Sequence, residues 1–393
     1  MARRASHSGG RRARRRRAER RRFWLVIMPG LVVAVVLTVI VGQLVRSAAD
    51  DGGATGSGGG KGGNAAHAPK RDTLLLTHRA ADGRSDLIVL VGTDGGGSSV
   101  LLIPVATQVE VPSLGVQTLA DMLREGDVSL LRTTVENLLG VRVARTMVLD
   151  DAGLKAALAP ASPVPVELRG AVRFSADGDP AFPAGSQRLS AADAVKLLAT
   201  AQPGSELDRL VTVQAVLQGW GAQLRKKRVA AATVAVQRDL VTLVTANRAR
   251  DPHIGSLPVE SVTTGGGERF EVRRDDLARY VKAAFPRMLL GPAGKRARVE
   301  ILNGTGAVGV AQAVAAKIVP AGGEVTLSGN VPGFGVAKTQ VIYYRDADQV
   351  TARRFLGALG CGVLKRARRA IGVTDVTIMV GADCPMTGTP AAT

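Results

Sequence analysis

A charged turn before an apolar run is the clearest candidate for chemistry in this chain. Residues Gly83-Arg84-Ser85-Asp86 lead directly into the strand-like segment Asp86–Thr93. An arginine beside a carboxylate at the mouth of a strand can hold a phosphate and a metal ion. The alternative is a solvated turn in which the two charges form a local ion pair. The spacing alone favours that alternative.

A second candidate is the glycine-rich stretch Gly304–Gly309, which matches G-x-G-x-x-G between an expected strand and an expected helix. In dinucleotide-binding folds such glycines let the backbone approach a pyrophosphate at a helix N-terminus. An acidic residue should then end the second strand, but Glu324 begins it. We therefore favour a tight turn, capped by Asn303 or Thr305, over an oxidoreductase that binds NAD or FAD.

The other reactive side chains are few. The four histidines lack the paired spacing of a zinc site, and the chain has no G-x-S-x-G motif and no P-loop. A bond between Cys361 and Cys384 would close a loop of about 24 residues and add roughly 3 kcal/mol of stability. We predict this disulfide over two buried thiols, because two cysteines can pair in an oxidising setting outside the cytoplasm.

An uncharged N-terminal segment, Phe23–Val45, decides in which compartment this chemistry takes place. As a helix its length is about 34 Å, enough to cross a bilayer core of about 30 Å. Eleven arginines precede it within residues 1–22, so the N-terminus should stay in the cytoplasm and the residues after Arg46 should lie outside. We favour this retained single-pass anchor in the cell membrane over a cleaved signal peptide, and we expect no nucleic-acid partner despite the net charge of +19.

The remainder of the chain divides into a tether and two domains. Residues 46–70 are mostly small or polar and form a flexible tether. Residues 71–290 contain short apolar runs typical of buried strands, such as Thr73–Thr77, and helical periods, such as Ser129–Leu139. Residues 297–385 alternate strand and helix, and residues 386–393 form a tail. We therefore predict two α/β domains.

Several segments, taken in order, resemble the LytR-CpsA-Psr (LCP) family. LLLTHRAADGRSDLIVLV, followed by LLIPVATQVEVPS, is similar to the opening of that family, and TVENLLG is close to its TVENLLGI helix. The segments 183–189 and Arg269–Phe285 resemble later parts of the same domain. Residues 297–385, with VEILNGTG and VTIMVGAD, resemble the LytR C-terminal domain. The resemblance implies an LCP-like mixed sheet with helices on both faces, followed by a small C-terminal α/β domain.

The LCP resemblance also implies an activity. LCP proteins are anchored, extracytoplasmic phosphotransferases that move a glycopolymer from a polyprenyl-pyrophosphate carrier to the cell wall, using Mg²⁺. Such chemistry needs arginines for the pyrophosphate, carboxylates for the metal and an apolar pocket for the lipid. Here only Arg84, Asp86 and Arg209 keep family identities, and Asp86 is the candidate metal ligand. The arginine and aspartate of the family's SIPRD motif are replaced by Val105 and Ala106.

Two further segments lack arginines that the family pattern has. The family's ALAYVRSR helix corresponds to residues 194–201, which contain no arginine, and the second arginine of its GRIERQ motif is Thr212. Loss of clustered cations should remove most of the affinity for a pyrophosphate. The first hypothesis is therefore a pseudoenzyme, a non-catalytic binding or regulatory member of the cell envelope. Its expected partners are the membrane and polyprenyl lipid, cell-wall glycopolymer or other envelope proteins.

The alternative hypothesis is an active, Mg²⁺-dependent glycopolymer phosphotransferase. In that case relocated cations, such as Arg188 or Lys196, would have to supplement the retained arginines. One sequence does not exclude such compensation. The two hypotheses differ in what the structure should place around the retained residues. The active enzyme needs several guanidinium groups that are free to bind a diphosphate, and the non-catalytic protein does not.

Overall fold

A computed structural model of the chain describes residues 72–93, 97–125, 127–227, 240, 244, 252–264, 267–292, 295–367 and 374–386. The predicted cytoplasmic tail, transmembrane helix and tether (1–22, 23–45 and 46–70) lie outside these residues, as does most of the predicted C-terminal tail. Within the described part, none of the helices combines the length and the apolarity needed to cross a membrane.

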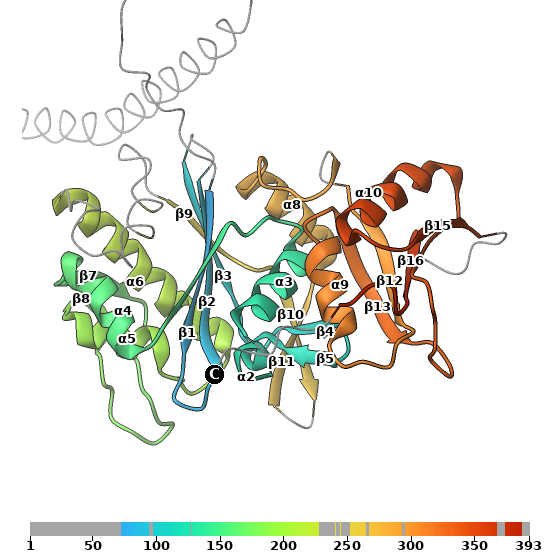
Figure 1. Cartoon of the computed structure of the whole chain (residues 1–393). Helices are drawn as coiled ribbons and strands as arrows, with labels where there is room; N and C mark the ends of the chain where they lie inside the picture. Colours follow the sequence, from blue (N-terminus) through green and yellow to red (C-terminus); the bar gives the residue numbers. More distant parts are fainter. Residues whose placement is uncertain are drawn as a thin grey trace, which may run out of the picture. The chain divides into compact units, whose positions relative to one another are not determined.

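Five strands form the central sheet of the first domain, in the order β6-β1-β2-β3-β9 (Figure 1). The β1–β2 and β2–β3 pairs are antiparallel, whereas β6 runs parallel to β1 and β9 runs parallel to β3. The sheet is therefore mixed, as predicted. The strands are β1 (Asp72–Arg79), β2 (Ser85–Thr93), β3 (Ser98–Ile103), β6 (Arg145–Leu149) and β9 (His253–Ser256).

Successive side chains of the central strands enter two different cores. In β2, Leu87 and Val89 belong to one core, and Ile88 and Leu90 belong to the other. Because neighbouring strand residues point to opposite faces, such a continuous apolar run is buried only if both faces are covered. Helices α4, α5 and α6 cover the first face, and α2, α3 and α8 cover the second (Figure 1). This confirms the predicted fold class.

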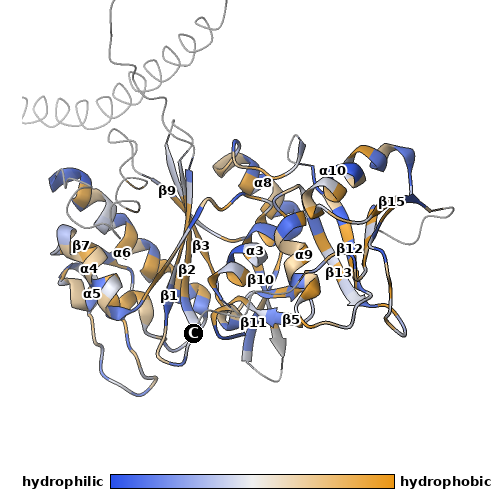
Figure 2. Cartoon of the chain, viewed as in Figure 1, coloured by the Kyte–Doolittle hydropathy of each residue, from blue (hydrophilic) through white to orange (hydrophobic). Residues whose placement is uncertain are grey.

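The helices of this domain are α2 (Met122–Glu125), α3 (Val128–Leu139), α4 (Asp151–Leu158), α5 (Ala191–Ala199), α6 (Glu206–Lys227) and α8 (Arg274–Ala284). In α6 the C-terminal end is polar, whereas the part beside the sheet is apolar (Figure 2). Three hairpins complete the domain, formed by β4 (Gln108–Val111) and β5 (Gly115–Thr118), β7 (Val164–Leu168) and β8 (Gly185–Leu189), and β10 (Val259–Thr264) and β11 (Gly267–Val272).

The helix α3 shows why the sequence pattern predicts its ends well. The Asp127 carboxylate accepts hydrogen bonds from the amides of Ser129 and Leu130, and Gly140 ends the helix in the left-handed conformation with φ of 66°. The strand expected at Arg142–Leu149 begins only at Arg145, because Arg142 donates its amide to the carbonyl of Met288 instead of a sheet partner.

The second domain has its own five-stranded sheet, in the order β13-β12-β16-β14-β15, with one antiparallel pair, β14–β16. A separate apolar core lies between this sheet and the helices α9 (Val310–Ile318) and α10 (Gln349–Leu359). The strands are β12 (Ala297–Asn303), β13 (Gly323–Asn330), β14 (Gln340–Tyr343), β15 (Val363–Arg366) and β16 (Val376–Val380).

The glycine-rich stretch after β12 is a turn whose donors are already used. The Asn303 side chain accepts hydrogen bonds from the amides of Thr305 and Gly306, at 3.0 and 3.2 Å. The Thr305 hydroxyl in turn accepts from the amide of Ala307. These amides would have to face a pyrophosphate in a dinucleotide site. The structure therefore agrees with the predicted capped turn.

The two domains are joined by side chains of α3 and of the segment that follows α8. The Asn137 side-chain amide donates to the carbonyl of Val325 on β13 and accepts from its backbone amide, both at 2.9 Å. Arg296 donates to the carbonyl of Asn137 and lies 3.4 Å from the carboxylate of Glu324. Glu324 also pairs with Arg274, at 3.0 Å. Glu324, whose place at the start of its strand argued against a dinucleotide site, thus serves the contact between domains.

A disulfide joins Cys361, after α10, to Cys384, after β16, with Cα atoms 5.6 Å apart. Cys384 is buried in the core of the second domain. Among the described residues there is no free cysteine. The bond ties the end of the last strand to the helix that packs on the same sheet.

Replacing both cysteines by serine should lower the free energy of unfolding by about 3 kcal/mol, because the bond closes a loop of moderate length. Urea unfolding of the full chain measures this loss. Reductant should destabilise the wild-type chain to the same extent and leave the double variant unchanged. A wild-type chain whose unfolding ignores reductant contradicts the prediction.

Candidate functional site

The three residues that keep LCP identities converge on one cavity. Arg84, Asp86 and Arg209 all line a pocket of about 500 Å³, here called the mouth pocket, at the N-terminal end of β2. The pocket lies between the turn before β2, the turn after β3 and the beginning of α6. Its charged residues are Asp82, Asp86, Glu206, Glu268, Arg84, Arg209 and Arg269.

Asp86 is held by a buried histidine. The Asp86 carboxylate lies 2.7 Å from Nδ1 of His78, and the Asp151 carboxylate lies 3.1 Å from Nε2 of the same ring. Burial lowers the pKa of His78, but the hydrogen bonds and negative charges of Asp86 and Asp151 outweigh this effect, and the net pKa is raised. When His78 is protonated, its imidazolium thus pairs with the carboxylate that was predicted to hold a metal.

Arg84 also has an internal partner. Its Nε lies 3.1 Å from the carboxylate of Asp121, which is shared with Arg124 at 3.1 Å. The Thr118 hydroxyl donates to the same carboxylate. The local pair expected within the turn, between Arg84 and Asp86, does not form in this geometry. Each of these two residues binds a different partner, 8 or 37 positions away along the chain.

Arg209 is a buried structural cation. Only 6% of its surface is exposed. It donates to the carbonyl of Leu198 at 2.7 Å and to the carbonyl of Asp86 at 2.6 Å, and it lies 3.7 Å from the Glu206 carboxylate. Its guanidinium thus links α6 to the end of α5 and to β2. At least two of its five N–H donors are therefore used within the chain.

The side chain of Glu206, at the beginning of α6, binds the turn that corresponds to the SIPRD motif. Its two carboxylate oxygens accept from the backbone amides of Val105 and Ala106, at 2.6 and 3.0 Å. Burial raises the pKa of Glu206, and the bonds from these two amides and the charge of Arg209 act against that rise. Glu268 lies beside it and accepts from the amide of Glu206 at 2.9 Å. Sequence reasoning missed both glutamates, because nothing local marks them.

Two of the positions at which the family pattern has arginine face the same pocket. Ala199 and Ala201, within the segment that corresponds to the family's arginine-bearing helix, line the mouth pocket with methyl groups. Arg188 lies exposed on β8, and Lys196 pairs with Asp193 on α5 at 3.7 Å. Neither lines the mouth pocket. The relocated cations of the alternative hypothesis therefore do not gather there.

The charges that line the mouth pocket do not suit a diphosphate with Mg²⁺. The lining holds four carboxylates and three guanidinium groups, and two of those guanidinium groups belong to Arg84 and Arg209, which are already paired. Asp86 is the expected metal ligand, but His78 engages its carboxylate. Within the described residues, no three acidic, histidine or cysteine side chains are placed to share a metal ion. The donor set thus does not fit Mg²⁺ as the LCP resemblance implies it.

The apolar space beside the sheet is nearly filled. It lies under α6 and is lined by side chains such as Leu76, Val89 and Trp220, with a volume of about 40 Å³. Small-molecule pockets usually have volumes of about 300–1,000 Å³. A polyprenyl chain would therefore require outward movement of α6 or its neighbours. The lipid-binding pocket implied by the LCP resemblance is closed in this conformation.

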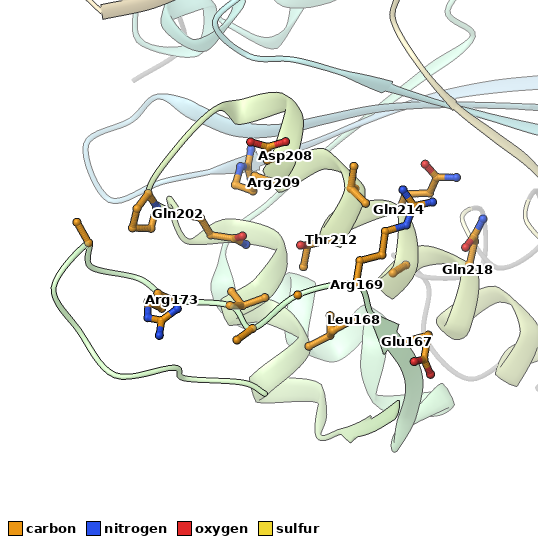
Figure 3. A pocket seen from close by; sticks show the side chains of 17 residues that line it. Glu167, Leu168, Arg169, Arg173, Gln202, Asp208, Arg209, Thr212, Gln214 and Gln218 are labelled. Atoms are coloured by element: carbon orange, nitrogen blue, oxygen red, sulfur yellow. The ribbon is translucent and has the colours of Figure 1, made fainter. Parts of the chain in front are cut away.

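A third cavity lies on the outer side of α6, with a volume of about 680 Å³. Thr212 lines it, together with Gln214 and Gln218 of the same helix (Figure 3). Arg169 and Arg173 contribute from the segment after β7, and Figure 3 shows that their guanidinium groups do not converge on one point. This cavity is polar but lacks a focused cation cluster.

Comparison with known families identifies the C-terminal part. Residues 296–383 match the family model described as LytR cell envelope-related transcriptional attenuator. The expected LytR C-terminal domain is therefore confirmed. None of the curated proteins gives a match to this chain.

Three solved structures show the similarity of this chain to known folds. They are B. subtilis TagT (17% identity, 56% of this chain, 91% of that chain, TM-score 0.47), B. subtilis TagV (17%, 56%, 98%, 0.46) and the LytR-CPS2A-psr family protein YwtF (TagT) with bound octaprenyl pyrophosphate lipid (16%, 56%, 91%, 0.46).

His78→Gln tests the buried charge at the mouth pocket. A raised pKa means that the imidazolium stabilises the fold fully below its unfolded pKa of about 6.5, and that this stability is lost as the pH rises through the folded pKa. The variant should be less stable than the wild type by about 2 kcal/mol at pH 5.5, and the difference should shrink at higher pH. Urea unfolding from pH 5.5 to 9 measures it, with exposed His253→Gln as the control. A constant difference across this range contradicts the prediction.

Arg209→Met tests whether Arg209 is structural. Because the substitution removes two hydrogen bonds to backbone carbonyls and leaves buried Glu206 without its cation, we expect a loss of about 3–5 kcal/mol in the free energy of unfolding. Exposed Arg188→Ala should change it by less than about 0.5 kcal/mol. An Arg209 held in reserve for a ligand would behave like Arg188 in this measurement.

Proposed function

We propose that this chain is a membrane-anchored, extracytoplasmic LCP-like protein of the cell envelope that binds or regulates and does not transfer glycopolymers. Three features support the envelope role. The motifs of residues 71–290 follow the LCP order, residues 296–383 match the LytR family model, and an uncharged segment precedes both.

The proposed location also agrees with the cysteines. Arginines flank the uncharged segment only on its N-terminal side, which favours export of everything that follows. Cys361 and Cys384 are bonded, and disulfides persist in oxidising compartments outside the cytoplasm. Together these observations favour an anchor that leaves both domains outside the membrane.

One observation carries the non-catalytic part of the proposal. Every retained LCP residue at the mouth pocket is engaged by another group of the chain: Arg84 by Asp121, Asp86 by His78, and Arg209 by two carbonyls and Glu206. Phosphoryl transfer depends on cations that converge on the developing negative charge. In this pocket Arg84 and Arg209 are engaged by partners within the chain, and four carboxylates face three guanidinium groups.

The second candidate function is an active phosphotransferase that attaches glycopolymers from polyprenyl-pyrophosphate carriers to the cell wall. It is favoured by one observation, namely that Arg84, Arg209 and Arg269 line the same pocket as Asp86. Solved structures of TagT contain bound octaprenyl pyrophosphate or LIIa-WTA, which suggests the substrate class to test.

A transfer assay separates the two candidates. The full chain, purified in detergent, is incubated with a polyprenyl-pyrophosphate-linked glycan, an acceptor glycan and Mg²⁺. We expect neither phosphate release nor glycan transfer above the protein-free background, because no free cation cluster binds the diphosphate. Asp86→Ala serves as the matched variant. Turnover by the wild-type chain that is lost in Asp86→Ala contradicts the proposal and establishes the second candidate.

A further inference from the structure

Two neighbouring backbone amides at the mouth pocket bind one carboxylate. Val105 and Ala106 lie in the turn after β3, and both line the mouth pocket. Their amides donate to different oxygens of Glu206, at 2.6 and 3.0 Å. Glu206 comes from a segment 101 residues later in the chain, and about 12% of its side chain is exposed.

This set of donors has the chemistry of an oxyanion site. Successive backbone amides that point to one spot form a concave donor set that suits phosphate or carboxylate oxygens. Here a buried guanidinium is added, since Arg209 lies 3.7 Å from the nearer carboxylate oxygen. Bonds between such donors and an ionised oxyanion are about twice as strong as neutral ones. The ligand of this donor set is the carboxylate of Glu206 itself.

We propose that Glu206 is the specificity-determining residue of the mouth pocket, an internal anion that keeps phosphate and diphosphate groups away from the amides of Val105 and Ala106. A phosphate would have to displace a carboxylate that already satisfies both donors. It would also meet the negative charge of Glu268, which lines the same pocket and accepts from the amide of Glu206. The proposal rests on the proposed function only in the choice of pyrophosphate as the test anion.

Removal of the Glu206 carboxylate should therefore create an anion site. In Glu206→Ala, two amides and the Arg209 guanidinium lose their ligand, and a cavity of suitable depth opens beside them. The variant should bind inorganic pyrophosphate at least tenfold more tightly than the wild-type chain. We expect the wild-type chain to bind it with a Kd weaker than about 1 mM.

Isothermal titration of the full chain in detergent with inorganic pyrophosphate, at constant ionic strength, measures both affinities. Glu206→Gln keeps the side-chain volume while removing the charge, and it is measured beside Glu206→Ala in case the smaller residue prevents folding. Glu260→Ala, on exposed β10, removes the same charge away from the pocket. Circular dichroism verifies that each variant is folded.

Binding that appears in the Glu206 variants, but not in Glu260→Ala, supports the proposal. Three outcomes overturn it: the wild-type chain binds pyrophosphate as tightly as the variants, folded Glu206 variants bind no better than the wild type, or Glu260→Ala gains the same affinity. The second outcome would leave Glu206 with a purely structural role. Because none of these results involves glycan transfer, they are distinct from a failure of the proposed function.

Discussion

The central sheet is apolar on both faces, and this constraint determines where charge can lie. Residues of β1, β2 and β3 fill two cores, so polar chemistry is confined to the ends of the strands. Near the N-terminal end of β2, the charge-bearing side chains of His78 and Arg209 are themselves buried. Unpaired charges in such positions are costly, and each must find a partner in the chain or in a ligand.

In this molecule the partners come from the chain. Glu206 accepts hydrogen bonds from the two amides of the turn after β3, and Arg209 donates to the carbonyl of Asp86. His78 contacts the Asp86 carboxylate. These contacts connect β1, β2, α5 and α6 into one network. A scaffold that depends on a bound diphosphate for charge balance would leave such groups exposed or unpaired. Here these charges are balanced by groups of the chain itself.

The local sequence pattern is sufficient to predict the elements that have a strong hydrophobic period or a clear terminal residue. The apolar runs of β1 and β2 and the helical period of α3 are predicted because their signals are contained in a few neighbouring residues. The short strand β9 was missed, since its four residues become a strand only by pairing with β3. Retention of Arg84, Asp86 and Arg209 was readable from the motifs. Their engagement is not, because Arg84 pairs with Asp121, 37 positions away, and Arg209 donates to the carbonyl of Asp86, 123 positions away.

The bond between Asn137 and Val325 has a consequence for the outer boundary of the second sheet. β13 is an edge strand, and an edge with free ladder groups invites strand addition by a neighbouring molecule. Asn137 saturates both backbone groups of Val325, so that stretch offers no template for intermolecular pairing. At the opposite edge, β15 carries Lys365 and Arg366, whose like charges repel an identical strand. Each edge of the second sheet thus carries one feature that opposes pairing with the edge of another copy.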